Sequence, residues 1–527
     1  MLKRLNYYIT FIFGSHYYYL ILGLVALTIY YPIIIKDHLF DIDYDLVIGP
    51  LRNVNTISDY FKVFTSKDLF DVQPIRDLSL LIDIQLEKIF NHQFFGISSL
   101  ILWLGTILTL EKILNFYTLK INSRLICLIA FSHPLMTWVL GWPTARKHIL
   151  SCFFITLATL YTIKMLRKNG KESFYIFLFC LLSLLSQPIT GLGIVIFFLY
   201  TYEHLKQRKE LLELLGLLSV TFLLIIGLNY FYYSYLYPDY TGTHKLAPVD
   251  TSSILVQFLA FSRSISQILI PLKFAQTYTV ESLLSFIGAP LLAILSYYSY
   301  IKVGIKKTSF FILFIFYPLF LILLNPTNIF VSDTYLIVSI INFAIIAGYF
   351  LKKTSTRFLR TSLFVVFFLV YSKSCIEIKN STTSLNFFQV SFEREPNCKN
   401  AHAYANELLK KNAVVLFMNI SGQALKNKCA MGGKIPSAIM NQVYAFRIVL
   451  DESFTQEYKL SSLKKIYYIT PETLFLMAIF LADKDPKESR RLFEENKILV
   501  HRDMKKILNA TSKKYCKNSQ LCKNYTL

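Results

Sequence analysis

Apolar blocks of roughly 17–25 residues, separated by short polar stretches, are the feature that most limits the possible folds of this chain. Each block is long enough to cross ~30 Å of hydrocarbon as a helix, and a helix satisfies its own backbone polar groups where water is absent. The chain is 54% hydrophobic with a mean hydropathy of +0.45. Soluble domains are nearer to about 45–50% apolar. The sequence therefore predicts an all-α polytopic membrane protein.

The distribution of positive charge favours a membrane protein over one that binds nucleic acid. The formal net charge is +22, but the basic residues form small clusters between the apolar blocks, as in the cytoplasmic loops of membrane proteins. The clusters are Lys3–Arg4, Lys120/Arg124, Lys164/Arg167/Lys168/Lys171, Lys206/Arg208/Lys209, Lys302/Lys306/Lys307 and Lys352/Lys353/Arg357/Arg360. We therefore expect membrane lipids and no nucleic acid among the partners.

Placing every basic cluster in the cytoplasm predicts about eleven transmembrane helices, with a cytoplasmic N-terminus. The first span, after MLKR, is too long for a cleaved signal peptide and is interpreted as an uncleaved anchor. The predicted spans lie near 16–36, 95–115, 124–141, 148–165, 173–187, 189–203, 212–233, 282–300, 308–325, 335–351 and 357–374. An odd number of spans leaves the C-terminal part on the exported side, which is periplasmic, extracellular or luminal.

The pattern predicts two domains. Residues 1–373 form the transmembrane domain, with long outer loops at 37–92 and 234–281, and residues 374–527 form a mainly helical soluble domain. Within the first loop, residues 74–83 are apolar at helical spacing, which predicts a helix along the membrane surface. Residues 470–495 are interpreted as two helices broken at Asp483-Lys484-Asp485-Pro486.

The eight cysteines divide between the two predicted domains. Cys127, Cys152 and Cys180 lie within apolar blocks and are interpreted as packing residues. The other five fall on the exported side, where an oxidising compartment permits disulfides and Cys516–Cys522 is a candidate pair. Their spacing does not match a zinc site.

Three carboxylates open the first outer loop, just past the first span. Asp41, Asp43 and Asp45 alternate along the chain, so at a membrane surface they can bind a divalent cation or supply a general base. An alternative interpretation is a solvated acidic edge that caps a following helix. The sequence does not identify a cofactor beyond this candidate cation.

Arg146 and Lys147 form an unusual cationic pair, because the topology places them on the outer side. One cation at mid-bilayer costs about 2.5–3.5 kcal/mol, so both must lie at an interface or in a watery cavity. An anionic ligand such as a lipid phosphate explains the pair, and snorkelling to headgroups is the alternative. His133 lies close by in sequence. Arg76, Arg263 and Lys273 are further outer cations, and Asp333 is a possible carboxylate partner.

Five segments, in this order, resemble polytopic glycosyltransferases of the GT-C class, in particular the transmembrane and tetratricopeptide-repeat O-mannosyltransferases and their bacterial relatives. The segments are DYDLVIGPLRNV (43–54), QPIRDLSLLIDIQL (73–86), HPLMTWVLGWPTARKHILS (133–151), LLSQPITGLGIVIFFLYTY (184–202) and SDTYLIVSI (332–340). In that family they correspond to an acidic pair, an Arg-Pro-Leu segment, an HP…W…GRK stretch, an LLSKP stretch and an RYLYLPS stretch. The resemblance spans roughly residues 17–350 and implies a GT-C-like fold.

The resemblance implies an inverting transferase that passes a sugar from a polyprenyl-phosphate carrier to a hydroxyl acceptor on a protein or an envelope glycan or lipid. In such enzymes an acidic residue of the first outer loop serves the acceptor as general base or metal partner. Asp43 matches the first position of the acidic pair, whereas Tyr44 stands at the second, with Asp45 one residue late and Asp41 two residues early. His133, Arg146 and Lys147 match family positions that face the carrier phosphate.

The chain also departs from the family at several polar positions. The departures are Gln73, Gly96, Trp103, Trp138, Gln187 and Thr334. They leave a catalytically inactive scaffold relative as one alternative to the transferase. A transporter or flippase of lipid-linked sugars is another, although such proteins tend to show repeated halves and the sequence shows none.

Overall fold

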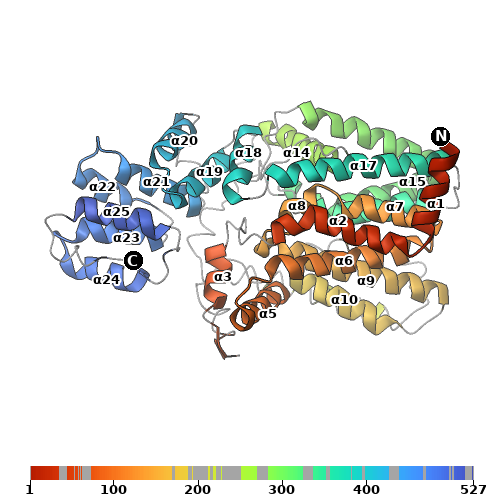
Figure 1. Cartoon of the computed structure of the whole chain (residues 1–527), viewed down its shortest axis with the longest axis horizontal. Helices are drawn as coiled ribbons and strands as arrows, with labels where there is room; N and C mark the ends of the chain where they lie inside the picture. The colour runs from red at the N-terminus through yellow and green to blue at the C-terminus, as the bar shows by residue number, and fades with distance from the viewer. Residues whose placement is uncertain are drawn as a thin grey trace. The chain divides into compact units, whose positions relative to one another are not determined.

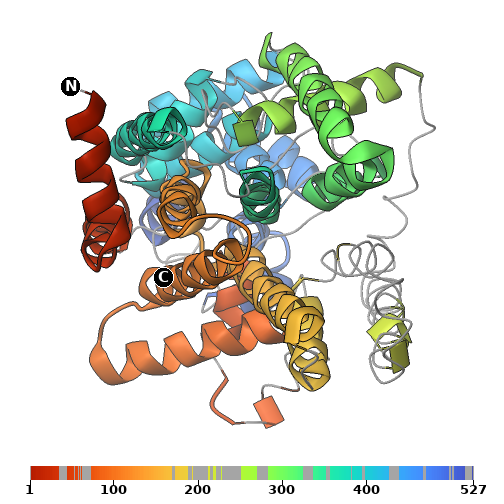
Figure 2. The same ribbon diagram turned by 90° about the vertical axis from the view of Figure 1, so that its right-hand side faces the viewer.

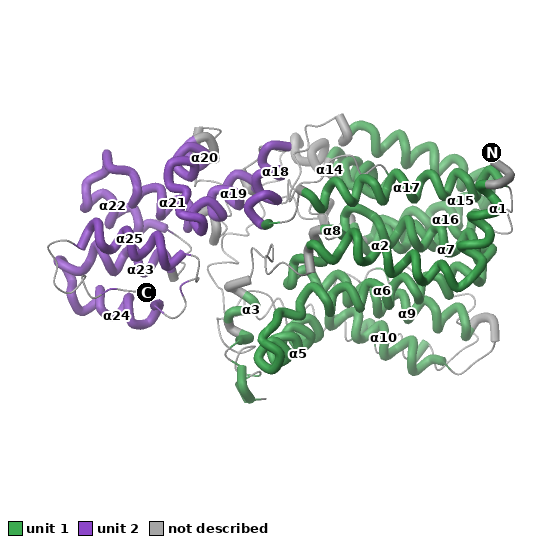
Figure 3. The backbone as a smooth tube through the Cα atoms, in the orientation of Figure 1, with its two compact units in different colours: residues 1–242, 246–274, 278–383 green, residues 243–245, 275–277, 384–527 purple. Residues whose placement is uncertain are grey.

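The structure is a computed structural model of the chain. It describes residues 2–34, 44–52, 54–56, 58–59, 61, 73–168, 172–187, 193, 212–213, 216, 218–220, 223, 227, 251–269, 283–324, 336–351, 357–380, 383–394, 398–426, 438–466, 471–497, 500, 504–516 and 525. All regular elements in these residues are helices, which confirms the predicted all-α class at this level. The chain divides into two compact units, coloured separately in Figure 3.

Unit 1 comprises residues 1–242, 246–274 and 278–383. Its described helices are α1 (Leu2–Gly14), α2 (Tyr17–Ile34), α3 (Tyr44–Arg52), α5 (Pro74–Phe90), α6 (Phe95–Leu114), α7 (Lys120–Phe131), α8 (Leu135–Val139), η1 (Pro143–Ala145), α9 (Arg146–Lys168), α10 (Ser173–Ser186), α14 (Thr251–Leu269), α15 (Leu283–Leu324), α16 (Leu336–Phe350) and α17 (Arg357–Asn380). Helices α2, α6, α7, α9 and α17 run alongside one another as a bundle (Figure 1).

Four helical stretches are long and apolar enough to cross a membrane, or up to five if α1 and α2 count as one bent span, among the described residues. The four are Phe95–Leu114, Pro143–Met165, Phe286–Tyr317 and Arg357–Lys379. Helices also occupy the predicted positions 16–36, 173–187 and 335–351, whereas most of 189–203 and 212–233 lies outside the described residues. The chain is therefore shown as an all-helical protein with several candidate membrane spans.

Two predictions about unit 1 need correction. The expected single span at 124–141 is broken into α7 and α8, because Pro134 has no backbone N–H and the chain leaves the helix at His133. The expected loop 234–281 contains the helix α14, which packs against α15 and α16. Serines 262, 264 and 266 interrupt its apolar pattern and are all buried. The polar residues led to the prediction of a loop, although they belong to a helix and are buried against its neighbours.

Helix α15 bends sharply at Gly304, which has the left-handed angle φ 79°. Only glycine adopts this conformation without strain. Thr308 Oγ1 donates to Ser299 Oγ at 3.0 Å, although nine residues of straight helix would hold these residues about 13 Å apart. The break lies between the two predicted spans 282–300 and 308–325, so α15 consists of two helical segments.

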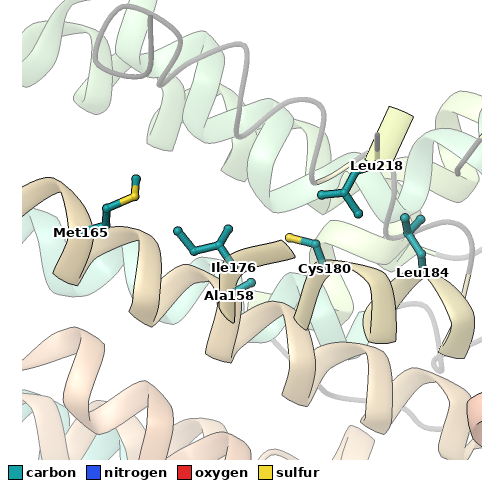
Figure 4. Packing of buried hydrophobic residues seen from close by; sticks show 6 residues of the cluster. All are labelled: Ala158, Met165, Ile176, Cys180, Leu184 and Leu218. Atoms are coloured by element: carbon teal, nitrogen blue, oxygen red, sulfur yellow. The ribbon is translucent and has the colours of Figure 1, made fainter. Parts of the chain in front are cut away.

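Side-chain packing and hydroxyl hydrogen bonds hold α9 against α10. Figure 4 shows one buried cluster from these helices and Leu218, whose other members are Ala158, Met165, Ile176, Cys180 and Leu184. Ser151 Oγ and Ser183 Oγ lie 3.2 Å apart, and Ser183 Oγ also donates to the Ser151 carbonyl at 3.0 Å. Lipid is as apolar as a leucine side chain, so close packing and hydrogen bonds are the forces expected to join membrane helices.

Unit 2 comprises residues 384–527 with two short stretches, 243–245 and 275–277. Its described helices are α18 (Ser384–Arg394), α19 (Cys398–Lys410), α20 (Val414–Lys426), α21 (Ala438–Leu450), α22 (Gln456–Leu463), α23 (Pro471–Leu481), α24 (Pro486–Asn496) and α25 (Lys505–Tyr515). The helix pair predicted within 470–495 is confirmed as α23 and α24. Asp485, in the predicted break, caps α24 by accepting a hydrogen bond from the Glu488 N–H at 3.1 Å.

The packing within unit 2 alternates in a regular way. Each of α19, α21 and α23 packs against the next helix along the chain and against the next but one. Helical hairpins stacked in tandem, as in solenoid proteins, produce this order of contacts. The sequence did not indicate a repeat array, because the successive hairpins differ in length and in loop composition.

Candidate functional site

The cation Arg146 lies at the first position of α9 and is completely buried. Pro143 begins the 3₁₀ turn η1 just before it, and the fixed φ of proline favours the start of a helix there. Arg146 Nη2 lies 2.5 Å from Asp83 Oδ2 on α5. The carboxylate of Asp83 thus neutralises the guanidinium in a place that water does not reach.

Three further hydrogen bonds hold the Arg146 guanidinium. Nε donates to Ser99 Oγ at 3.1 Å, Nη1 to the Ser79 carbonyl at 3.3 Å and Nη2 to the Phe95 carbonyl at 2.5 Å. These partners belong to α5 and α6, so one side chain of α9 joins three helices. The planar fork of arginine suits such multiple bonding better than the ammonium of lysine would.

Helix α5 turns its charged face toward the protein and its apolar face outward. Arg76, Asp77 and Asp83 are buried, and Ser98 Oγ donates to Asp83 Oδ1 at 2.6 Å. Exposed apolar side chains cover the opposite face: Leu78, Ile82, Ile89 and Phe90. An outward apolar face of this kind suits a helix in contact with lipid.

Arg76, a predicted ligand-binding cation, forms an ion pair with its neighbour. Its Nε lies 2.6 Å from Asp77 Oδ1, and both side chains are buried. Asp77 Oδ2 accepts a hydrogen bond from the backbone N–H of Gln73, the residue that caps α5, at 3.0 Å. The negative charge of Asp77 in the first turn also interacts favourably with the positive end of the helix dipole. The pair stabilises the start of α5.

The acidic segment of the first outer loop leads into α3. Asp41 and Asp43 lie outside the described residues, as does the side chain of Asp45 in the first turn of α3. Helix α3 itself packs against α5 and against η1, the turn that immediately precedes Arg146. An apolar cluster joins α3 and α5 to the start of α6: Val47, Ile48, Leu51, Leu80, Ile84 and Phe95. The helix whose first turn contains Asp45 therefore meets the turn that precedes Arg146.

An ion pair at the far end of α3 strengthens this packing. Arg52 Nη2 lies 2.8 Å from Glu87 Oε2 on α5 and 3.1 Å from Oε1. Both side chains are partly exposed, so we expect the pair to contribute no more than about 1 kcal/mol. Its main effect is to fix the direction of α3 along α5.

His133 lies in the break between α7 and α8 and is buried. Its Nδ1 accepts a hydrogen bond from the Leu135 N–H at 3.3 Å, and its Nε2 lies 3.3 Å from the Ile268 carbonyl on α14. A carbonyl can only accept, so we infer that Nε2 carries the proton and that the ring is neutral. Arg263, also buried, lies on α14 five residues before Ile268. His133 thus joins the break to the helix that carries Arg263.

The carbonyl groups freed by the break are satisfied by neighbouring helices. Tyr30 Oη and Trp103 Nε1 both donate to the Phe131 carbonyl, the latter at 3.4 Å. Ser374 Oγ donates to the Ser132 carbonyl at 2.5 Å. Within a membrane such groups need protein partners, because lipid supplies none. Trp103 thus supplies a donor that the broken helix needs.

The predicted site residues fall into two sets. The first set lies at α5: Arg76 is on this helix, Arg146 pairs with its Asp83, and α3 packs against it. The second set lies where the break between α7 and α8 contacts α14: His133 is in the break and Arg263 is on α14. Lys147 is partly buried, and Asp333 lies outside the described residues. The described residues contain no group of three His, Cys, Asp or Glu able to hold a metal.

Sequence reasoning missed Asp83 and Asp77, the partners of the two arginines. Both lie in the stretch predicted as a surface helix, where a charged residue is expected to face water. The available signal was the free-energy cost of burying the charge of Arg146, since a buried cation requires a nearby acid. No spacing in the sequence indicates which acid it is.

Comparison of the chain with protein-family models, with curated proteins and with solved structures finds no match.

Proposed function

We propose that the chain is a membrane glycosyltransferase with about eleven spans, which transfers a sugar from a polyprenyl-phosphate carrier to a hydroxyl acceptor on the exported face. One observation carries the proposal: α3, which begins at the acidic segment, packs against η1, which ends beside Arg146 and Lys147. A transferase of this kind needs an acid for the acceptor and cations for the carrier phosphate within one pocket.

We assign different roles to the two neighbouring cations. Arg146 is buried and neutralised by Asp83, so its part is to hold α5 and α6 in place around the site. Lys147, one residue further and only partly buried, is the candidate for the carrier phosphate. Lysine serves as a point charge for phosphate groups in many sites.

The proposed reaction is a single displacement. Asp43 accepts the proton of the acceptor hydroxyl, whose oxygen forms a bond to the anomeric carbon of the sugar. The bond from that carbon to the phosphate oxygen breaks at the same time, and the electron pair leaves with the carrier phosphate. Attack from the face opposite the leaving group inverts the anomeric carbon. Lys147 stabilises the charge that develops on the phosphate.

The cysteines support an exported location for unit 2. Cys516 is disulfide-bonded, while its predicted partner Cys522 lies outside the described residues. Cys127, Cys152 and Cys180 of unit 1 are free and buried. Structural disulfides persist in oxidising compartments, so the bridge favours the predicted topology.

The transporter alternative gains less support. Transporters use broken helices whose free backbone groups bind the substrate or its coupling ion. At the break between α7 and α8, the carbonyls of Phe131 and Ser132 already accept hydrogen bonds from Tyr30, Trp103 and Ser374. The broken helix is thus stabilised by the protein and does not need a transported ligand to satisfy these carbonyls.

The experiment measures sugar transfer by the purified full chain in nanodiscs, from polyprenyl-phosphate-linked mannose or glucose to membrane-protein acceptors. Asp43→Asn should lower kcat about 100-fold or more, because a general base contributes about that much. Lys147→Gln should mainly raise KM for the lipid donor. Asp59→Asn is the matched control: Asp59 lies in the same loop, accepts hydrogen bonds from Thr56 and should be dispensable.

Three outcomes would contradict the proposal. Unchanged transfer by Asp43→Asn would remove Asp43 from the mechanism. Movement of lipid-linked sugar across vesicles without a new glycosidic bond would favour the transporter. A normal cellular phenotype in a chain with alanine at both Asp43 and Lys147 would favour the inactive scaffold.

A further inference from the structure

The first helix, α1, lies across the end of the bundle. A bend of 91° separates Leu5–Gly14 from Tyr17–Pro32. In Figure 1 α1 runs across the ends of α2 and α17, and in Figure 2, which looks along the bundle, α1 (red) is seen from its side. Helix α2 has 18 residues and is ~27 Å long, so it nearly crosses ~30 Å of hydrocarbon without α1. Helix α1 is therefore free to lie in the membrane plane.

The inner face of α1 is firmly anchored to two other helices. Arg124 on α7 donates to the carbonyls of Phe13 at 2.9 Å and of Ser15 at 2.7 Å, which are the groups freed at the corner between α1 and α2. Arg360 on α17 donates to Thr10 Oγ1 at 3.2 Å. Arg124 is itself neutralised by Glu111 at 2.8 Å. The bend is thus held by specific contacts within unit 1.

The outer face of α1 is aromatic and has no cover from the described residues. Tyr7, Tyr8 and Phe11 each expose more than half of their surface, whereas Ile9 is 1% exposed. Tyr17, just beyond the corner, is similarly exposed and lies 5.6 Å from the Phe11 ring. Tyrosines gather at the level of lipid headgroups, where the ring contacts hydrocarbon and the hydroxyl contacts water.

Basic residues collect at the same end of the bundle. Lys3 and Arg4 lie in the first turn of α1. Lys120 and Arg357 begin α7 and α17, which both pack against α1, and both residues are exposed. Each basic residue near an anionic membrane surface contributes about 1 kcal/mol of attraction. Aromatic rings and positive charge together match a layer of anionic lipid headgroups.

We propose that α1 is an interfacial helix that binds anionic phospholipids. Its aromatic face lies at the headgroup level, and its basic first turn, with the basic starts of α7 and α17, attracts the lipid phosphates. The role is independent of sugar transfer, because the topology places this end of the bundle on the side opposite the acidic loop.

The first arm of the test measures how deeply α1 lies in the bilayer. The full chain carries Tyr8→Cys together with Cys375→Ser, because Cys375 is free and only partly buried and would also take the label. It is labelled with bimane and placed in nanodiscs containing phosphatidylcholine with a nitroxide either on the headgroup or near the end of the acyl chain. We expect stronger quenching by the headgroup nitroxide. Leu27→Cys is the matched control, because Leu27 is exposed in the middle of α2 and should be quenched more by the chain nitroxide. A Tyr8 label that behaves like the Leu27 label would overturn the proposal.

The second arm measures lipid preference at the same Tyr8 label, as the ratio of quenching by headgroup-labelled phosphatidylglycerol to quenching by phosphatidylcholine. Lys3→Gln and Arg4→Gln should each lower this preference roughly fivefold. Lys411→Gln, an exposed charge in unit 2, should leave it unchanged. Equal quenching of the Tyr8 label by both lipids, in the chain that keeps Lys3 and Arg4, would refute the anionic preference.

Discussion

The buried pair of Asp83 and Arg146 is the contact whose loss should be most costly in unit 1. The change Asp83→Asn keeps the shape of the side chain and an oxygen for Ser98, and removes only the negative charge. Arg146 then remains buried with no counter-charge, although its bonds to Ser99, Ser79 and Phe95 persist. Removing one partner of a buried pair costs about 3–5 kcal/mol, and the persisting bonds favour the lower figure.

A loss of about 3 kcal/mol corresponds to a decrease in Tm of roughly 6–12 °C, at 2–4 °C for each kcal/mol. The native thiols provide the assay in a chain with Cys375→Ser, because Cys375 is free and only partly buried, whereas Cys127, Cys152 and Cys180 are free and buried and react with a thiol dye only on unfolding. Arg491→Gln in unit 2 is the matched control: it breaks exposed pairs with Glu488 and Glu495, so its effect should stay below about 1 kcal/mol.

The reverse change tests the same reasoning from the other partner. Arg146→Met leaves a buried carboxyl, which can lose its charge by binding a proton, whereas an arginine cannot give one up. We therefore expect Arg146→Met to cost less than Asp83→Asn. The double change Asp83→Leu with Arg146→Met should recover most of the stability. If Asp83→Asn melts like the Arg491→Gln control, Arg146 is not held by Asp83.

Two further changes test other contacts. Gly288→Ala would place a Cβ 1.7 Å from the Ser262 carbonyl oxygen where α15 crosses α14. We therefore expect the chain to lose about 3 kcal/mol or more of stability, measured with the same thiol assay. Normal melting would show that the helices do not approach so closely. Cys516→Ser should destabilise unit 2 by about 2–4 kcal/mol and remove the effect of reductant on the melting of the full chain, and a wild-type chain insensitive to reductant would show that the bridge is absent.

The membrane helices could be predicted from the sequence because their length and composition follow from the bilayer itself. Helices α6, α9, α10, α16 and α17 lie where apolar blocks of sufficient length occur. The break at Pro134 was within reach of the same reasoning, since proline cannot continue the hydrogen-bond ladder of a helix. Helix α14 was not, because serines and an arginine that face other helices are indistinguishable in sequence from those of a loop.

The candidate site was only partly predictable, for a physical reason. The cost of Arg146 in a membrane follows from its charge alone, so its need for an anion was evident. Whether that anion is a lipid phosphate or an acid of the chain depends on which helices meet, and the structure pairs it with Asp83.

The amino-acid order by itself determined that this chain is helical and where its apolar blocks lie, because these properties depend on residues close together in the chain. Only the tertiary structure decided that α5 turns its charges inward, that α3 packs on η1 and that α1 bends across the bundle. Each of these depends on contacts between residues far apart in sequence, whose energies exist only after the helices have packed.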